Sequence, residues 1–192
     1  MLFQLLTLLG GLIVGWARKG SLWSIVSVRL KLLWLLPSAY FVQQLSIHYL
    51  TGTAYELLLV SSYIALITFC AFNIRTPGVA WALGGTIANF AVLVVNGLKM
   101  PAYIPAVERF APNLVPRLLS GTYGKSVAMT DGTKLNFLGD IFDVHIPPFP
   151  PHTLVSIGDI LIAIGLIIFL QFAMRLDGRT SPSGGAQPET TS

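Results

Sequence analysis

The chain has 192 residues, of which 54% are hydrophobic and 10% are charged, and its mean hydropathy is +0.72. Soluble domains carry about 25% charged residues, so this composition excludes an ordinary water-soluble globule and predicts an integral membrane protein. The single cysteine, Cys70, excludes an internal disulfide and a multi-cysteine metal site. The net charge of +4 does not predict nucleic-acid binding, because the basic residues flank apolar runs as membrane topology signals do.

Five apolar segments predict an all-α integral membrane protein with five transmembrane helices. A spanning helix needs about 20 apolar residues, within a range of roughly 17–25. The predicted spans are residues 2–16, 32–49, 54–73, 79–98 and 157–174. The corresponding domains are a four-helix membrane segment, a small extracytoplasmic cap between helices four and five, the fifth transmembrane helix and a disordered cytoplasmic tail, at residues 1–98, 99–156, 157–175 and 176–192.

Small residues and one proline fit this assignment. The first span is followed by positive charge and lacks a small-residue cleavage site, so we interpret it as a helix and not as a signal peptide. Gly11 and Gly15 are spaced for close contact with a neighbouring helix, and we expect Gly84 and Gly85 to serve packing. Pro37 falls in the first turns of its span, where a missing N–H is tolerated.

The link between the first two spans, residues 17–31, has two interpretations. Serines at every third position alternate with apolar residues, which is typical of an amphipathic segment lying among lipid headgroups. The same stretch is equally compatible with a loop that leads into the next helix and has no lipid role.

The distribution of Lys and Arg predicts the orientation of the chain. Five spans place the 17–31 link, the 73–78 loop and the tail on one side of the membrane. That side carries seven basic residues against two acidic ones: Arg18, Lys19, Arg29, Lys31, Arg75, Arg175 and Arg179 against Asp177 and Glu189. The positive-inside rule therefore predicts a multi-pass protein of the cytoplasmic membrane with its N-terminus outside and its C-terminus in the cytoplasm.

The cap holds eight of the chain's 12 prolines and many apolar residues, which predicts an ordered unit on the membrane surface. "PAVERF", starting at Pro105, predicts one short helix. Asp131-Gly132 lies between two strand-like runs and predicts a β-hairpin. "IPPFPPH", residues 146–152, is expected to be extended, because the residue before a proline avoids the helical region.

Asp159 interrupts the start of an otherwise apolar run, "SIGDILIAIG". With Ser156 it forms the pattern S-x-x-D, which predicts a capping box at the N-terminus of the last helix. A second Gly-Asp pair, Gly139-Asp140, precedes it. Capping explains how a carboxylate is tolerated at this position, but it does not explain the second pair.

A candidate polar cluster lies at the outer ends of the helices. Asn89 and Asn96 are seven residues apart and share a helix face, which should look into the bundle. Lys99 follows at the same membrane level as Asp159. The candidate cluster comprises Asn89, Asn96, Lys99, Asp140 and Asp159. Its alternative role is purely structural, as a network that pins the cap to the helices.

Other chemistry is not predicted. His48, His145 and His152 all fall on the outer side, but they lack helical metal-ligand spacing, so no metal and no cofactor are expected. The chain contains no nucleophile-elbow motif, no P-loop and no dinucleotide-binding glycine pattern.

Three stretches resemble a known family: "NGLKMP" at 96–101, "TKLNFLGD" at 133–140 and "SIGDILIAIG" at 156–165. Together with the glycine-containing first span and the basic link, they make residues 1–175 similar to the bacterial membrane protein family catalogued as domain of unknown function 5317. The resemblance implies a membrane location but no activity. It also implies that the residues of these motifs belong together, namely Asn96, Gly97, Met100, Pro101, Gly139, Asp140, Gly158 and Asp159.

Two functions of different classes remain open at this stage. The favoured one is a non-catalytic scaffold, or a protein that binds membrane lipid or a membrane-protein partner, at the outer face of the cytoplasmic membrane. The alternative is an enzyme or carrier that acts on a lipid-linked or amphiphilic substrate with Asp140 and Asp159.

Overall fold

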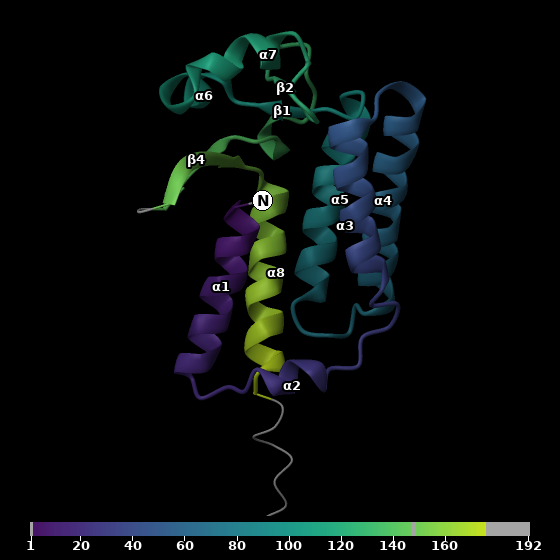
Figure 1. The fold of residues 1–192 in the computed structure, drawn as a ribbon, viewed down its shortest axis with the longest axis vertical. Coiled ribbons are helices and arrows are strands. Elements are labelled where there is room, and N and C mark those ends of the chain that lie inside the picture. Colours follow the sequence, from purple (N-terminus) through teal and green to yellow (C-terminus); the bar gives the residue numbers. More distant parts are fainter. Residues whose placement is uncertain (1, 147–148, 176–192) are drawn as a thin grey trace, which may run out of the picture.

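The computed structural model describes residues 2–146 and 149–175, and the predicted disordered tail at 176–192 lies outside the described residues. The long helices stand side by side as a bundle, with the cap at one end and a short link helix at the other (Figure 1). The long helices are α1 (Leu2–Ala17), α3 (Leu35–Tyr49), α4 (Gly52–Phe72), α5 (Val79–Val95) and α8 (Ile157–Ala173).

Backbone conformation explains where two helices are shorter than predicted. The second predicted span begins at residue 32, but α3 begins only at Leu35, because Leu32 has a left-handed φ of 54° that an α-helix does not accommodate. The fourth predicted span extends to residue 98, but α5 ends at Val95, since Gly97 and Leu98 have φ values of 62° and 60°. Pro37 lies in the first turn of α3, as predicted.

Of the helices in the described residues, α4 is the one long and apolar enough to cross a membrane. The apolar helices Phe3–Ala17, Val79–Val95 and Ile157–Ala173 are shorter than 18 residues. α3 has 15 residues and carries Gln43, Gln44 and His48. The length and composition of this helix indicate membrane association, and the five spans stay a prediction.

The long helices pack in the order α1, α8, α5, α4, α3, which differs from their order in the chain. α5 and α8 approach so closely that a side chain added at Gly85 would meet the backbone of Gly158, and one added at Gly165 would meet Gly78. The predicted packing role is confirmed for Gly85, whereas Gly84 faces open space.

The predicted close contact of the first helix is also confirmed. A side chain added at Gly11 would meet Leu170, and one added at Gly15 would meet Met174. Both partners belong to the last turn of α8 or follow it directly. The glycines of α1 therefore seat this helix against α8.

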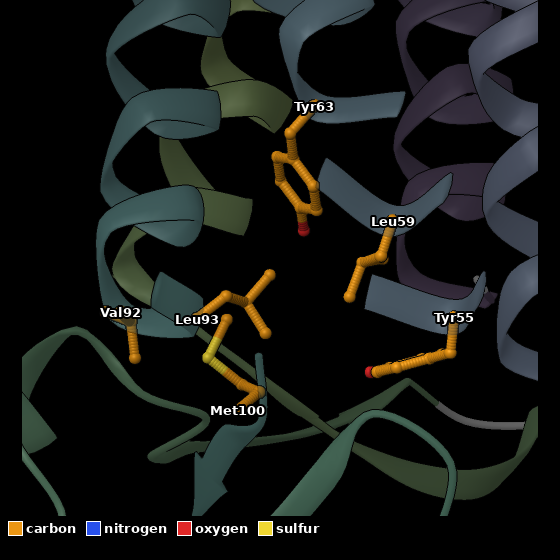
Figure 2. Packing of buried hydrophobic residues seen from close by; sticks show 6 residues of the cluster. All are labelled: Tyr55, Leu59, Tyr63, Val92, Leu93 and Met100. Carbon is orange, nitrogen blue, oxygen red and sulfur yellow. The ribbon is translucent and has the colours of Figure 1, made fainter. Parts of the chain in front are cut away.

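The main hydrophobic core lies where the bundle meets the cap. Tyr55, Leu59 and Tyr63 of α4 pack against Val92 and Leu93 of α5 and against Met100 (Figure 2). The Tyr55 hydroxyl donates a hydrogen bond to the Leu98 carbonyl, 2.9 Å away. The Tyr63 hydroxyl points into the space between α4 and α5. The core therefore fixes the start of the cap on the ends of two helices.

The cap is ordered, as predicted, and contains short helices and strands. Its helices are α6 (Ile104–Phe110), the 3₁₀ turns Pro112–Leu114 and Asn136–Leu138, and α7 (Val115–Leu119). β1 (Met100–Ala102) pairs in parallel with β2 (Ser126–Ala128), and β3 (Phe142–Ile146) pairs antiparallel with β4 (Phe149–Val155). The link helix is α2 (Trp23–Val26). The all-α prediction therefore holds for the bundle but not for the cap.

Three local predictions for the cap have clear outcomes. The helix predicted at "PAVERF" is confirmed as α6. The hairpin predicted around Asp131-Gly132 is wrong, because β2 pairs with β1 and the chain after the turn enters a 3₁₀ turn instead of returning as a strand. The extended conformation predicted for "IPPFPPH" is confirmed in β4, while residues 147–148 lie outside the described residues.

Candidate functional site

Asp159 lies at the centre of a hydrogen-bond network at the N-terminus of α8. The predicted capping box is confirmed: the Asp159 N–H donates to the Ser156 Oγ at 2.9 Å, and the Ser156 N–H donates to the Asp159 Oδ2 at 3.1 Å. Oδ1 accepts from Asn89 Nδ2 at 3.1 Å and from Gln4 Nε2 at 3.3 Å. The fully buried Ser156 also donates its hydroxyl to Asn89 Oδ1 at 2.7 Å. The network joins α1, α5 and α8.

Asp140 is held beside this network by the cap. Its backbone N–H donates to the Pro101 carbonyl at 2.8 Å, and its carbonyl accepts from the Tyr103 N–H at 3.0 Å. Gly139 before it has no room for a side chain, because a Cβ there would lie 2.6 Å from the Pro101 carbonyl oxygen. The Gly-Asp pair therefore lets the chain run tightly along β1 and direct the Asp140 side chain toward the bundle.

Lys125 supplies a positive charge that interacts with both carboxylates. It directly precedes β2, and its carbonyl accepts a hydrogen bond from the Met100 N–H at 2.7 Å. Burial alone would lower the pKa of Lys125, but Tyr63, Asp140 and Asp159 oppose this effect and the pKa lies above its usual value. The lysine also hydrogen-bonds with the Tyr63 hydroxyl, so it is held in its charged form between cap and bundle.

Asp140 has a strongly perturbed carboxyl group. Its pKa is raised to about 7, first because the group is buried and second because the Asp159 carboxylate lies nearby, while the Lys125 ammonium acts in the opposite direction. Two carboxylates and one ammonium in a confined space leave an excess negative charge. Asp140 is therefore the group that takes up or releases a proton near neutral pH.

Two members of the predicted cluster lie elsewhere. The Asn96 side chain binds the cap backbone at Lys134, with Nδ2 donating to the carbonyl at 2.8 Å and Oδ1 accepting from the N–H at 2.7 Å. Lys99 Nζ donates to the Gly124 carbonyl at 2.6 Å and lies 5.5 Å from the centre of the Tyr55 ring. Asn89, Asp140 and Asp159 are brought together, whereas Asn96 and Lys99 fasten the cap loops.

A cavity of about 780 Å³ lies between α1, α3 and the cap segment 117–126. Its walls carry two cationic side chains, Arg117 and Lys125, together with His48, several amides and hydroxyls, and no carboxylate. The lining residues are Gln4, Tyr40, Gln43, Gln44, Ile47, His48, Arg117, Thr122, Tyr123, Gly124, Lys125 and Ser126. The Arg117 guanidinium carbon lies 5.2 Å from the centre of the Tyr123 ring, a cation–π contact between two residues of the cavity wall.

The cavity and the acidic network share two residues. Gln4 and Lys125 both line the cavity, and both interact with Asp159. The Gln4 Oε1 is buried and has no hydrogen-bond partner among the described residues. Buried polar atoms are normally paired, so this oxygen marks a place where a ligand's donor group would be favourable.

The three histidines lie in two separate places, and no group of three metal-ligating side chains occurs in the described part of the chain. His152 Nδ1 lies 2.9 Å from Asp143 Oδ1, and its ring stacks on the rings of His145 and Phe110. His48 is separate from them and belongs to the cavity wall.

The fold and site define a mostly helical protein whose ordered cap covers a polar cavity at one end of an apolar bundle. The chain belongs to the family of unknown function DUF5317, whose model matches residues 27–171. It is also similar to an uncharacterized protein of Thermotoga maritima, with 30% identity over 128 residues that make up 67% of this chain and 70% of that protein. No solved structure matches the chain. The predicted family resemblance is therefore confirmed.

Sequence reasoning missed the residues that connect the cavity to the network. Gln4 is a single polar residue within the first apolar segment, and Lys125 belongs to a cap segment that was predicted to form a hairpin. A usable signal existed for α3, because Gln43, Gln44 and His48 are unusual in a helix expected to lie in lipid.

Proposed function

We propose that this protein is a five-span membrane protein that binds the anionic headgroup of an amphiphile at the outer face of the cytoplasmic membrane. The observation that carries the proposal is the cavity of about 780 Å³, whose wall combines Arg117 with amide side chains, while Lys125 lines it with its charge offset by Asp140 and Asp159. Arginine and lysine in such a setting match phosphate or carboxylate groups, and Arg binds them in a bidentate geometry. Gln43 and Gln44 add donors for the neutral part of a headgroup.

The proposed topology is supported by the ends of the bundle. Arg18, Lys19 and Arg75 lie in turns at the end that carries α2, and the cap occupies the other end (Figure 1). With these basic turns in the cytoplasm, the cap and its cavity face the outer side. The short helices α1, α5 and α8 would span with local thinning of the bilayer, which costs only fractions of a kcal/mol per Å of mismatch.

The test is lipid binding by the purified full chain in nanodiscs or by native mass spectrometry. We expect phosphatidylglycerol to be retained over phosphatidylcholine, and Arg117→Gln to weaken this preference on the order of tenfold, about 1.4 kcal/mol. Arg109→Gln is the matched control, because Arg109 is an exposed arginine of the same cap outside the cavity. Equal retention of both lipids by the unsubstituted protein would refute the proposal.

A second candidate function is favoured by Asp140. A half-buried carboxyl with a pKa of about 7 near Lys125 and Asp159 is an arrangement used in proton transfer, so an enzyme or carrier acting on the bound amphiphile is the alternative. Asp140→Asn separates the two functions: it should leave headgroup binding at acidic pH intact and abolish turnover or transport. A cellular phenotype that survives Asp140→Asn unchanged would exclude this alternative.

A further inference from the structure

A second cavity, of about 280 Å³, lies deeper in the bundle among α3, α4, α5 and α8. Its walls are apolar side chains and glycine backbone, apart from Thr86 and the Cys70 thiol. The Thr86 hydroxyl donates to the Ala82 carbonyl at 2.8 Å, so it is already satisfied within its own helix. The cavity therefore offers a hydrocarbon surface and no free polar group of Thr86.

One face of α3 lines both the deep cavity and the polar cavity. On α3, Leu36 lines the deep cavity, while Tyr40, Gln43 and Ile47 line the polar one at spacings of four, three and four residues. Residues three or four apart share a helix face. One face of α3 is therefore apolar at one end and polar at the other.

The two helices opposite repeat this gradient. On α8, Asp159 of the polar network is followed on the same face by Ile162, Leu166 and Phe169, which line the deep cavity. On α5, Asn89 is preceded on the same face by Thr86 and Ala82. Polar groups thus gather beneath the cap on each helix, and apolar groups line the same face further from it.

The far end of the deep cavity is closed by the link. Asn73 holds the backbone of Lys31 with a pair of hydrogen bonds, its Oδ1 accepting from the N–H and its Nδ2 donating to the carbonyl, each at 2.8 Å. Leu30 consequently packs against the cluster of Phe69, Cys70 and Val79 and forms the floor.

We infer that the deep cavity holds an acyl chain of the lipid whose anionic headgroup occupies the polar cavity. The inference rests on the proposed function and adds the tail-binding half of the site. The helix segment from Asp159 to Phe169 rises about 15 Å at 1.5 Å per residue. An acyl chain that fills the deep cavity therefore extends past the middle of the bundle, toward the end closed by the Asn73–Lys31 contact. Leu30, which closes the far end of the deep cavity, limits the length of the acyl chain that fits.

The experiment uses phosphatidylglycerol with a photoactivatable diazirine near the end of one acyl chain, incorporated at trace level into nanodiscs with the full chain. Adducts are located by mass spectrometry after illumination. We expect them to concentrate in segments 66–70 and 162–169, and to fall on the order of tenfold when the same probe carries a phosphatidylcholine headgroup.

Two variants that fill the deep cavity and one control variant complete the test. Leu166→Trp in α8 and Leu36→Trp in α3 should each lower the adduct yield on the order of tenfold, because the added indole ring occupies the space of the acyl chain. Ile167→Trp is the matched control, since Ile167 is the next residue on α8, is exposed and lies outside the cavity. Size-exclusion profiles establish that each variant is folded, and using two variants from different helices protects against the loss of one.

Adducts spread evenly over the outer surface of the bundle, or independent of the headgroup, would overturn the inference. An adduct yield unchanged in both Leu166→Trp and Leu36→Trp would also overturn it, because the acyl chain would then not lie in the deep cavity. If phosphatidylglycerol is retained selectively but the adducts do not localise, the headgroup proposal stands and the tail site falls. If neither lipid is preferred, the proposed function itself fails.

Discussion

The Gln4 side chain on α1 donates a hydrogen bond to the Asp159 carboxylate on α8, across 155 positions of sequence and a distance of 3.3 Å. This contact joins the first and last helices at the level of the cap. It also brings the wall of the polar cavity, to which Gln4 belongs, into contact with the network of Asn89 and Ser156. Asp159 therefore caps α8 and is linked through Gln4 to the wall of the candidate ligand site.

Removing the Asp159 carboxylate should destabilise the protein more than a loss of capping alone. Asp159→Ala removes a cap contact worth about 1 kcal/mol and leaves the amides of Asn89 and Gln4 without their acceptor, at about 1 kcal/mol each. We expect a loss on the order of 2–3 kcal/mol. Asp159→Asn keeps an acceptor oxygen and should lose less.

Thermal unfolding of the purified protein in detergent measures this difference. Asp131→Ala is the control, because Asp131 lies exposed in a cap turn. If Asp159→Ala unfolded at the same temperature as Asp131→Ala, the network would not contribute to stability.

Two adjacent glycines of α5 should respond in opposite ways to the same substitution. Gly85→Ala places a methyl group against the Gly158 carbonyl and 2.9 Å from Ile162, so α5 and α8 must separate. We expect a loss of more than about 2 kcal/mol of stability, as for overpacking in a tight core. Gly84→Ala meets nothing within 4 Å and should be neutral or stabilising by up to about 1 kcal/mol, because alanine favours helix.

The comparison of these two variants by thermal unfolding has its own internal control, since they differ by one position. Equal destabilisation would show that α5 and α8 do not pack through Gly85 and Gly158.

The stability of the protein should fall as the pH rises through the range in which Asp140 loses its proton. The pKa of this carboxyl is 3.8 in its ordinary state and about 7 in the fold. Between these values the folded protein binds a proton that the unfolded chain has released, so the free energy of unfolding decreases with rising pH by at most about 1.4 kcal/mol per unit. Above about pH 7 this contribution is constant.

Asp140→Asn removes this titration, so its unfolding temperature should be higher than that of the unsubstituted protein at pH 8 and closer to it at pH 5. Asp131→Asn, in the exposed turn, should leave the pH profile unchanged. An identical slope between pH 4 and 7 in Asp140→Asn would show that Asp140 is not the titrating group.

The sequence predicted the helices and the local chemistry at Asp159 because both depend on nearby residues. Apolar runs of sufficient length define the bundle helices, and the S-x-x-D pattern contains both halves of the capping box. The start of α3 and the end of α5 were predicted less accurately. Leu32 and Leu98 have a left-handed conformation, and nothing in the sequence distinguishes them from leucines in a helix.

The long-range contacts could not be predicted from the sequence. The partner of β2 is β1, in which Met100 pairs with Ser126, 26 residues further along the chain, and short strands carry too little pattern to reveal such a pairing. Gln4 and Lys125 join the site only because α1 packs on α8 and the cap folds over the bundle. The sequence shows the small residues that permit close helix packing, but it does not show which residues they contact.

The last prediction concerns the orientation of the chain, on which the position of the headgroup site depends. The basic turns with Arg18, Lys19 and Arg75 are predicted to face the cytoplasm, which places the cap outside. In a Cys70→Ala background, Gly132→Cys should react with a membrane-impermeant maleimide in intact cells, because Gly132 is exposed in the cap and has space for a side chain. Ser183→Cys, in the tail outside the described residues, should react only after the membrane is opened. Labelling in the reverse order would place Asp140, Asp159 and the cavity on the cytoplasmic side, and binding of an outer-leaflet lipid would then be excluded.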